Sequence, residues 1–482
     1  MAVKTVGKGC VASCRRNLSG YRPTRINPIH LNEGRPIVTA IKRLANFATS
    51  ANPSDELRQI IAPAVADCFG CILAGADAEV TQRAIRALSR TGNGSATVYG
   101  SDQKLAAPHA ALANAVAGHA WDLDDWEEPG NTHPTVVLLP ALLAAAHLSP
   151  TSGKELSNAY AIGAEIIMRL GEAVSLDHYA RGFHSTATLG TIGAAGAVSR
   201  LLRLSPEQTS HALALSVSQA TGLTLQFGSN AKPLQAGWAA RNGLEAALMA
   251  AEGVSAQHHV LDHPRGFAGL LGDLNGARFE RALASLGEPW ALQQYGLILK
   301  LWPSCGYTHR LMTAALELRP HIIDQLEKVT AISATLPDFH FEILPFQNPI
   351  TRSEALFSAP ACIGQALVAG DLTLNDSEAR FWESPEVARL IQLTTVTPEP
   401  ALHPELNYDP DQPDCLRVEL SGSEFLETRC AYPLGAPQNP MSNEQLANKF
   451  AQITGRDKDG FSELMNWPDA PDVENFFSEI AK

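Results

Sequence analysis

The chain has 482 residues, which is more than one compact hydrophobic core normally holds, so we expect two domains. Its formal net charge of −13 disfavours nucleic-acid binding, because neutralising phosphates takes clustered Lys and Arg side chains. No apolar run approaches the roughly 20 residues that span a bilayer, so we expect no membrane contact. Eight cysteines in so long a chain predict reduced thiols, and Cys68 and Cys71 lie in an apolar helical pattern typical of core packing.

Residues 1–35 form a basic leader that we place outside the fold. The first 32 contain no acidic residue, and their basic residues are Lys4, Lys8, Arg15, Arg16, Arg22 and Arg25. This charge is typical of a mitochondrial transit peptide, but no amphipathic stripe accompanies it. A disordered extension or a start codon placed too far upstream explains the leader equally well. We therefore expect a cytoplasmic protein, with the mitochondrion as the alternative if the leader is a transit peptide.

Residues 36–298 are expected to form a large all-helical domain. Apolar residues recur at helical spacing in PIVTAIKRLANFATS, ELRQIIAPAVADCFGCILAGA, QRAIRALSR and AAPHAALANAVAGHAWDL. The later segments GTIGAAGAVSRLL, HALALSVSQATGL and AGWAARNGLEAALMA are rich in Ala and Gly. Because small side chains let helices approach closely, we expect a dense helical core.

Residues 299–438 change to a mixed pattern that predicts a smaller α+β domain. VTAISATLPDF, LTTVTPE and CLRVELSGSEFLETR have the alternating or β-branched runs of strands, and helical stretches such as YTHRLMTAALEL lie between them. In the tail, residues 439–482, SNEQLANKFAQIT begins with a capping box, and we expect its helices to return to the first domain. The predicted fold class is therefore mainly α.

The first polar cluster among apolar surroundings is HAWDLDDWEEPGNTHPTVVLLP. We expect a helix from Ala107 to Asp124, then a loop, then another apolar helix. Five acidic residues fall between positions 122 and 128, and neighbouring carboxylates suit proton transfer or cation binding. Glu127 and Glu128 are expected to be solvated, as most carboxylates are. Asp122 and His133 border the most apolar helices and are candidate site residues.

Two further clusters place basic side chains at predicted helix starts. His184 in GFHSTATLGTIGAAG precedes a helix of small residues, where orphan N–H groups favour an anion. Lys232 in GSNAKPLQAGWAARNG lies at the entrance of an Ala-rich helix, where a lysine suits carboxylate binding or proton transfer. The alternatives are a structural histidine and a surface lysine.

A weaker candidate for a site is WPSCGYTHR, which lies where the helical region changes to the mixed one. It offers Cys305, Tyr307 and His309. Clefts between domains commonly hold active sites. A Cys–His pair suits nucleophilic catalysis only if a third group orients it, so these two residues alone do not establish it.

Six motifs occur in a fixed order: HAWDLDD…THP, GFHSTATLGTIGAAG, AKPLQAGWAARNG, WPSCGYTHR, RSEALFSAPACIGQAL and PLGAPQNPMSNEQLANKF. With them the chain resembles the MmgE/PrpD family from about Val38 to Pro468. That family includes 2-methylcitrate dehydratases, cis-aconitate decarboxylases and an iminodisuccinate epimerase. The resemblance implies a large all-helical domain with a smaller α+β lid, usually in a homodimer. It also implies an active-site cleft between the domains that needs no metal or organic cofactor.

The resemblance also implies the residues of the site. Its catalytic residues are Asp122, His133, His184 and Lys232, and its expected substrate contacts are Trp126, Gln235, Cys305 and His309. We expect Lys232 and His184 to bind carboxylates of a small polycarboxylic acid. His133 would be the general acid/base, because Asp122 would fix its tautomer and raise its pKa. Arg241 is expected to be structural.

Several positions depart from the family pattern. Trp126 stands where a Thr is common, Gln235 where a His typically follows KPL, and Cys305 where decarboxylase-type members tend to have His. Ala361 stands where those members carry a Tyr, and the loop between Asp125 and His133 looks one residue longer. These departures argue against simply copying the decarboxylase reaction. They leave open whether Cys305 or His309 takes the place of the lid-side histidine.

The expected function is a cofactor-independent lyase that moves a proton next to a carboxylate during dehydration or decarboxylation of a small di- or tricarboxylic acid. Epimerisation of a substituted succinate is the alternative within the family. DLDD is also a DxDD motif, which in class II terpene cyclases supplies the proton that starts cyclisation, although 6% aromatic residues are few for such a pocket. A magnesium site on Asp122, Asp124 and Asp125 and a non-catalytic carboxylate-binding protein are the remaining alternatives.

Overall fold

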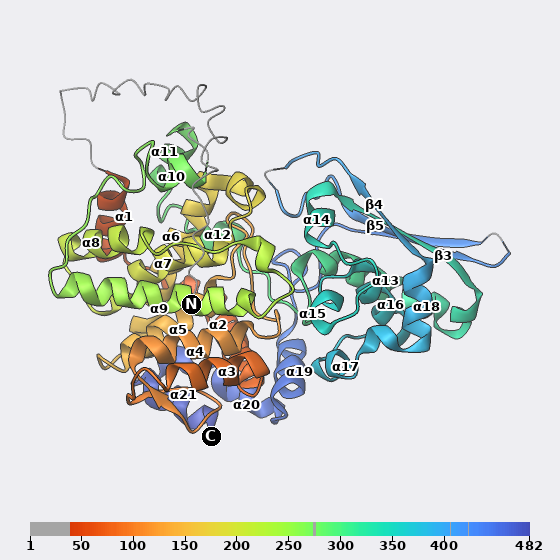
Figure 1. Ribbon diagram of the computed structural model, residues 1–482, viewed down its shortest axis with the longest axis horizontal. Coiled ribbons are helices and arrows are strands. Elements are labelled where there is room, and N and C mark those ends of the chain that lie inside the picture. Colours follow the sequence, from red (N-terminus) through yellow and green to blue (C-terminus); the bar gives the residue numbers. More distant parts are fainter. Residues whose placement is uncertain (1–38, 273–275, 405, 423) are drawn as a thin grey trace, which may run out of the picture. The chain divides into compact units, whose positions relative to one another are not determined.

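The computed structural model describes residues 39–272, 276–404, 406–422 and 424–482, so the basic leader lies outside the described residues (Figure 1). In the described part, helices dominate and the strands form two small sheets. The predicted fold class, mainly α with a smaller mixed region, is confirmed.

The first part of the chain is helical apart from a short antiparallel ribbon of β1 (Ala96–Thr97) and β2 (Lys104–Leu105). Its helices are α1 (Ala40–Ser50), α2 (Asp55–Gly75), α3 (Glu79–Leu88), α4 (Ala107–His119), α5 (Pro134–Ala146), α6 (Gly153–Ala180), α7 (Ser185–Leu201), α8 (Pro206–Val217), α9 (Ala231–Ala251), α10 (Phe267–Leu271), α11 (Gly276–Ala284) and α12 (Ala291–Tyr295). Helix α5 is buried along its whole length and contacts α4, α6, α7 and α9.

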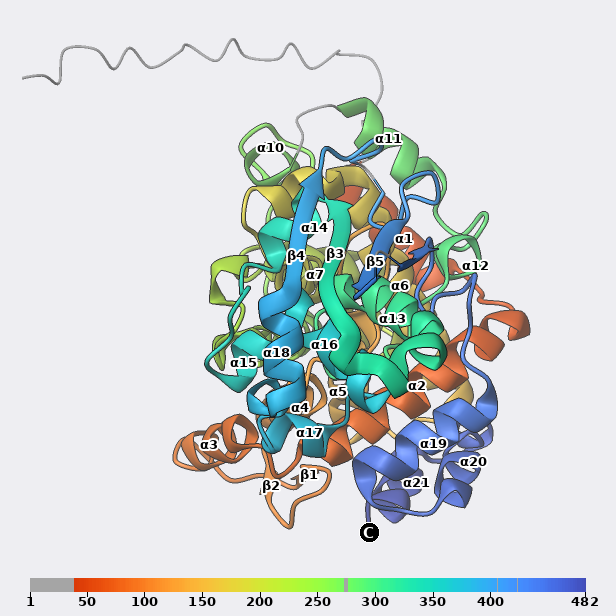
Figure 2. The same ribbon diagram turned by 90° about the vertical axis from the view of Figure 1, so that its right-hand side faces the viewer.

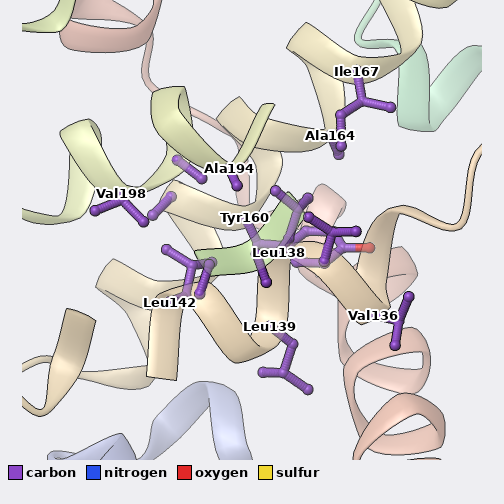
Figure 3. Packing of buried hydrophobic residues seen from close by; sticks show 14 of the residues in the cluster. Val136, Leu138, Leu139, Leu142, Tyr160, Ala164, Ile167, Ala194 and Val198 are labelled. Carbon is purple, nitrogen blue, oxygen red and sulfur yellow. The ribbon is translucent and has the colours of Figure 1, made fainter. Parts of the chain in front are cut away.

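Figure 3 shows how α5 fills this core: Leu138 and Leu142 lie among Tyr160 of α6 and Ala194 and Val198 of α7. The expected close approach of small residues is also present. A Cβ at Gly243 of α9 would lie 2.4 Å from the Cβ of Ala194, so only glycine fits there. Helices α7 and α9 therefore pack almost backbone to backbone.

The second part holds a four-stranded sheet in the order β4-β3-β5-β6. Its strands are β3 (Val329–Pro337), β4 (Thr394–Glu399), β5 (Asp414–Leu420) and β6 (Phe425–Cys430), and its helices are α13 (His309–Ile322), α14 (Asp338–Ile343), α15 (Arg352–Ala355), α16 (Ala359–Ala369), α17 (Leu374–Glu378) and α18 (Pro385–Leu393). Strand β3 pairs in parallel with β4 and antiparallel with β5. Figure 2 shows β4, β3 and β5 side by side, with α18 leading directly into β4. The strands predicted from the sequence are therefore present.

The tail consists of α19 (Asn443–Thr454), α20 (Lys458–Leu464) and α21 (Val473–Ala481). The predicted capping box is present, because Ser442 and Gln445 satisfy each other's backbone N–H groups. Helix α19 packs against α2, and α21 packs against α5 (Figure 1). The domain boundaries at 298/299 and 438/439 stay a prediction.

Helix α2 corrects one expectation. By length and composition alone its 21 residues could cross a membrane, whereas the sequence pattern suggested that no run approached that length. In the protein, 67% of its most apolar stretch is buried, with Ile61 and Phe69 fully inside the helical core. A core helix passes the same test of length and apolarity, so the expectation of no membrane contact stays a prediction.

A second correction concerns helix α4, which ends at His119 rather than at the predicted Asp124. Asp122 has a φ of 54°, in the left-handed region that helices do not use. Asp124 and Asp125 then turn inward, and both are fully buried. The acidic residues therefore lie on a loop inside the protein and not on a helix face.

Candidate active site

Three helix N-termini meet around one cavity. His133 is the N-cap of α5, His184 is the N-cap of α7, and Lys232 is the second residue of α9. Neither histidine uses its side chain to cap its own helix, so both imidazoles are free to face the cavity. Helix N-termini carry unpaired N–H groups and a partial positive charge, so this arrangement favours an anion.

The cavity encloses about 370 Å³ of empty space, a volume that includes open solvent at its mouth. Six predicted site residues line it: Asp122, Trp126, His133, His184, Lys232 and Cys305. Six further side chains that the sequence did not single out, or did so only in passing, complete it: Asn131, Tyr179, Phe227, Lys300, Tyr307 and Phe357. The wall is thus part cationic and part aromatic.

Asp122 holds two lysines together. Nζ of Lys232 lies 2.6 Å from Oδ2 of Asp122, and Nζ of Lys300 lies 2.8 Å from its Oδ1 and 2.9 Å from its main-chain oxygen. Burial raises the pKa of the Asp122 carboxyl, but the two lysines outweigh burial and leave its pKa below the ordinary value. One carboxylate against two ammonium groups leaves a net positive charge at this end of the cavity.

Lys232 is further fixed by aromatic rings. Its Nζ lies 5.1 Å from the ring centroids of both Phe227 and Phe357, within cation–π range. The lysine is therefore a buried, pre-positioned cation and not the surface lysine of the alternative reading.

A second carboxylate, Asp124, orients two imidazoles. Nδ1 of His119 lies 2.8 Å from Oδ1 of Asp124, and Nδ1 of His133 lies 3.1 Å from Oδ2. Burial raises the pKa of Asp124, but His119 and His133 outweigh it and leave the pKa well below its usual range. Nε2 of His133 lies 3.8 Å from Asp122. Asp124, and not Asp122 as predicted, is therefore the carboxylate that orients His133.

The predicted upward shift of the pKa of His133 is also wrong. Burial lowers this pKa to about 4, Asp124 opposes the shift, and the nearby Lys300 reinforces it. The pKa of His184 is lowered in the same way. Burial is the larger cause and Lys232 the next, and together they hold this pKa well below the ordinary value. Both imidazoles are therefore neutral near pH 7.

Glu127 and Glu128 were expected to be solvated, and for Glu127 this is wrong. It is fully buried and accepts hydrogen bonds from the main-chain N–H groups of Gly130 and Thr132. Burial raises the pKa of each glutamate to about 7. These bonds fold the loop back on itself, and the loop in turn brings Asn131 and His133 to the cavity.

With this geometry in place, comparison with known proteins assigns the family. Residues 42–280 match the MmgE/PrpD N-terminal domain, and residues 302–458 match the MmgE/PrpD C-terminal domain. The chain belongs to the MmgE/PrpD family. It is 30% identical over 382 residues to the cis-aconitate decarboxylase of Mus musculus, covering 74% of each chain. It is 29% identical over 442 residues to the cis-aconitate decarboxylase of Aspergillus terreus, covering 85% of this chain and 87% of the relative. These relatives support an enzyme of the lyase class.

Two residues expected to contact substrate in this MmgE/PrpD protein do not line the cavity that the described residues form. Gln235 lies behind His184 and bonds to its ring. His309 is buried against the ring of Trp302, at 5.1 Å between centroids, because it begins α13 and faces the hydrophobic cluster that packs α13 against the four-stranded sheet. Cys305 does line the cavity, and whether it or His309 takes the place of the family's lid-side histidine stays open. Burial raises the pKa of its thiol to about 11.

Sequence reasoning missed Lys300 and His119. Lys300 lies in the apolar run GLILKLWP, and a lysine is rarely buried without a partner, so the argument applied to Lys232 would have found it. His119 gave no such signal, because it stands at helical spacing in α4. Its role depends on Asp124 turning back from the loop.

The side chains of His119, Asp122, Asp124 and His133 also have ligand atoms close enough together to hold a metal ion. Asp125, part of the weighed magnesium site, instead accepts a hydrogen bond from Thr135 at 2.6 Å. Two lysines already neutralise Asp122, which opposes a further cation beside it. The prediction that the site needs no metal or cofactor stays a prediction.

Proposed function

We propose that this chain is a cofactor-independent lyase acting on a small polycarboxylic acid of the aconitate or 2-methylcitrate type. The observation that carries the proposal is the grouping of two buried lysines, three helix N-termini and two neutral imidazoles in one cavity. Cations bind the carboxylates, and a neutral imidazole accepts or returns the proton that such a reaction moves.

In this proposal Lys232 and Lys300 bind substrate carboxylates in competition with Asp122. The bound anion raises the pKa of His133, so that this imidazole can take a proton, and Asp124 stabilises the resulting imidazolium. In a dehydration, His133 removes the proton next to a carboxylate and the electron pair forms the alkene. The leaving hydroxyl takes that proton back from the imidazolium and departs as water. In a decarboxylation, the C–C bond breaks, CO₂ leaves, and protonated His133 delivers its proton to carbon.

The test is an NMR screen of the full chain in D₂O against 2-methylcitrate, cis- and trans-aconitate, citrate and substituted succinates. Alkene formation from a hydroxy acid supports dehydration, and CO₂ release with deuterium at carbon supports decarboxylation. If His133→Ala and Lys232→Ala both keep full turnover on an accepted substrate, the assignment of the site is wrong. Chelation by EDTA should leave turnover unchanged.

Epimerisation of a substituted succinate is the second candidate. The rings of His133 and His184 both line the cavity, and an epimerase needs one group to remove a proton and another to return it. Deuterium exchange at carbon with neither alkene nor CO₂ would favour this reaction. Tight binding without exchange or turnover would instead favour the non-catalytic carboxylate-binding protein.

A DxDD-type cyclase fits the geometry poorly. Such chemistry needs a carboxylic acid that donates a proton into the cavity. Neighbouring cations and imidazoles hold Asp122 and Asp124 ionised, and Asp125, whose pKa burial raises, does not line the cavity that the described residues form. A homodimer and a cytoplasmic location are further proposals for this chain.

A further inference from the structure

The amide of Gln235 has two different partners. Nε2 of Gln235 donates to the main-chain oxygen of Leu223 at 3.2 Å, and its Oε1 lies 2.5 Å from Nδ1 of His184. A carbonyl oxygen can only accept a hydrogen bond, so the NH₂ group of Gln235 must face Leu223. The amide oxygen therefore faces His184, and that oxygen can only accept as well.

It follows that Nδ1 of His184 carries the proton of the neutral ring. Its other nitrogen, Nε2, is then left with a lone pair. This Nε2 is buried, has no hydrogen-bond partner among the described residues, and belongs to a ring that lines the cavity. We propose that Gln235 is a positioning residue that holds His184 in one neutral tautomer, with Nε2 presented to the substrate as a hydrogen-bond acceptor.

His133 and His184 therefore have different partners at Nδ1. His133 has a carboxylate, Asp124, behind its Nδ1, whereas His184 has an uncharged amide. A carboxylate stabilises an imidazolium and an amide does so far less. Lys232, His119 and His133 also face His184, and positive charge on any of them opposes a proton there. In the proposed dehydration of a hydroxy acid, His133 takes the proton, and His184 stays neutral and accepts a hydrogen bond from the substrate hydroxyl. This role of His184 rests on the proposed function.

The tautomer can be read without any substrate. Long-range ¹H–¹⁵N NMR of the full chain labelled at histidine distinguishes a protonated from a bare ring nitrogen, and His184→Asn assigns the signal. In the wild type we expect protonated Nδ1 and bare Nε2 at pH 7. Gln235→Leu should populate the other tautomer, whereas the nearly isosteric Gln235→Glu should keep the tautomer and raise by about one unit the pH at which His184 becomes an imidazolium. An unchanged tautomer in Gln235→Leu would overturn the proposal, whatever the enzyme turns over.

Kinetics on an accepted substrate give a second readout. With Gln235→Glu, the acid limb of the kcat/KM profile should move to higher pH by about one unit, because a carboxylate partner raises the pKa of His184. Gln235→Leu should lower kcat at least tenfold and change KM less than threefold. The matched control is Asn242→Leu, which removes another buried amide of α9 that bonds to Gln219 and Arg241. A shift of equal size in the control, or an unmoved profile in Gln235→Glu, would show a merely structural role.

Discussion

At the scale of single residues, the site separates ionised carboxylates from neutral imidazoles. Asp122 stays ionised because two lysines contact it, and Asp124 because two histidines do. His133 is neutral because burial outweighs its carboxylate partner. In the proposed reaction, a polyanionic substrate therefore contacts fixed cations first, and His133 takes a proton only once the bound anionic charge has raised its pKa.

The first prediction concerns Lys232. Lys232→Met keeps the length of the side chain and removes one of the two cations that face Asp122. We expect kcat/KM to fall by about 100-fold, or ~3 kcal/mol, the upper end for a hydrogen bond to a charged group. Steady-state kinetics on the substrate found by NMR measures the change. Lys154→Met, an exposed lysine of α6, is the control and should keep kcat/KM within twofold. Equal losses in the two variants would contradict the role of Lys232.

At the scale of elements, the sequence predicted features that depend on neighbouring residues, and it missed contacts between residues far apart in the chain. The starts of α5, α7 and α9 were visible in the sequence, since helix starts depend on neighbouring residues, and so His133, His184 and Lys232 were found. The approach of Lys300 to Asp122 spans 178 positions and has no local signal. The partner of His133 was misassigned for the same reason, because helical spacing extended α4 past His119 and hid the inward turn of Asp124.

The second prediction concerns helix α19, which contacts the loop that carries Asp122 and Asp124. Lys449 of α19 is buried; its Nζ lies 2.7 Å from Asp67 of α2 and donates to the main-chain oxygen of Leu123 at 3.1 Å. Lys449→Met leaves the Asp67 carboxylate buried without its cation. We expect the free energy of unfolding in urea to fall by about 3–5 kcal/mol, as when one partner of a buried ion pair is removed.

The control for Lys449 is a second substitution in the same pair. Adding Asp67→Asn to Lys449→Met removes the stranded charge and should recover part of the lost stability. If the double variant is as unstable as the sum of the single ones, the two side chains are not coupled. Lys449 would then not hold the Leu123 loop through its ion pair with Asp67.

At the scale of the whole molecule, the described residues form three hydrophobic clusters, and the second of the two largest also holds ionisable groups. The first is the helical core around α5, and the second joins α13, α16 and α18 to the sheet. His309 begins α13 in this second cluster, and its Nε2 is buried with no hydrogen-bond partner among the described residues. Burial lowers the pKa of His309 to about 3, and Lys300 reinforces the shift.

The last prediction follows from the sign of that shift. Folded protein keeps His309 neutral, whereas unfolded chain takes up a proton below about pH 6.5, so the stability associated with this residue is present above pH 6.5 and is lost as the pH falls toward 3. His309→Leu removes this dependence. Between pH 7 and pH 5, the free energy of unfolding of the variant should rise relative to wild type by about 2 kcal/mol. Urea unfolding at the two pH values measures it. His321→Leu, at an exposed position of the same helix, should track the wild type, and a parallel change in both variants would mean that His309 is not the group that titrates.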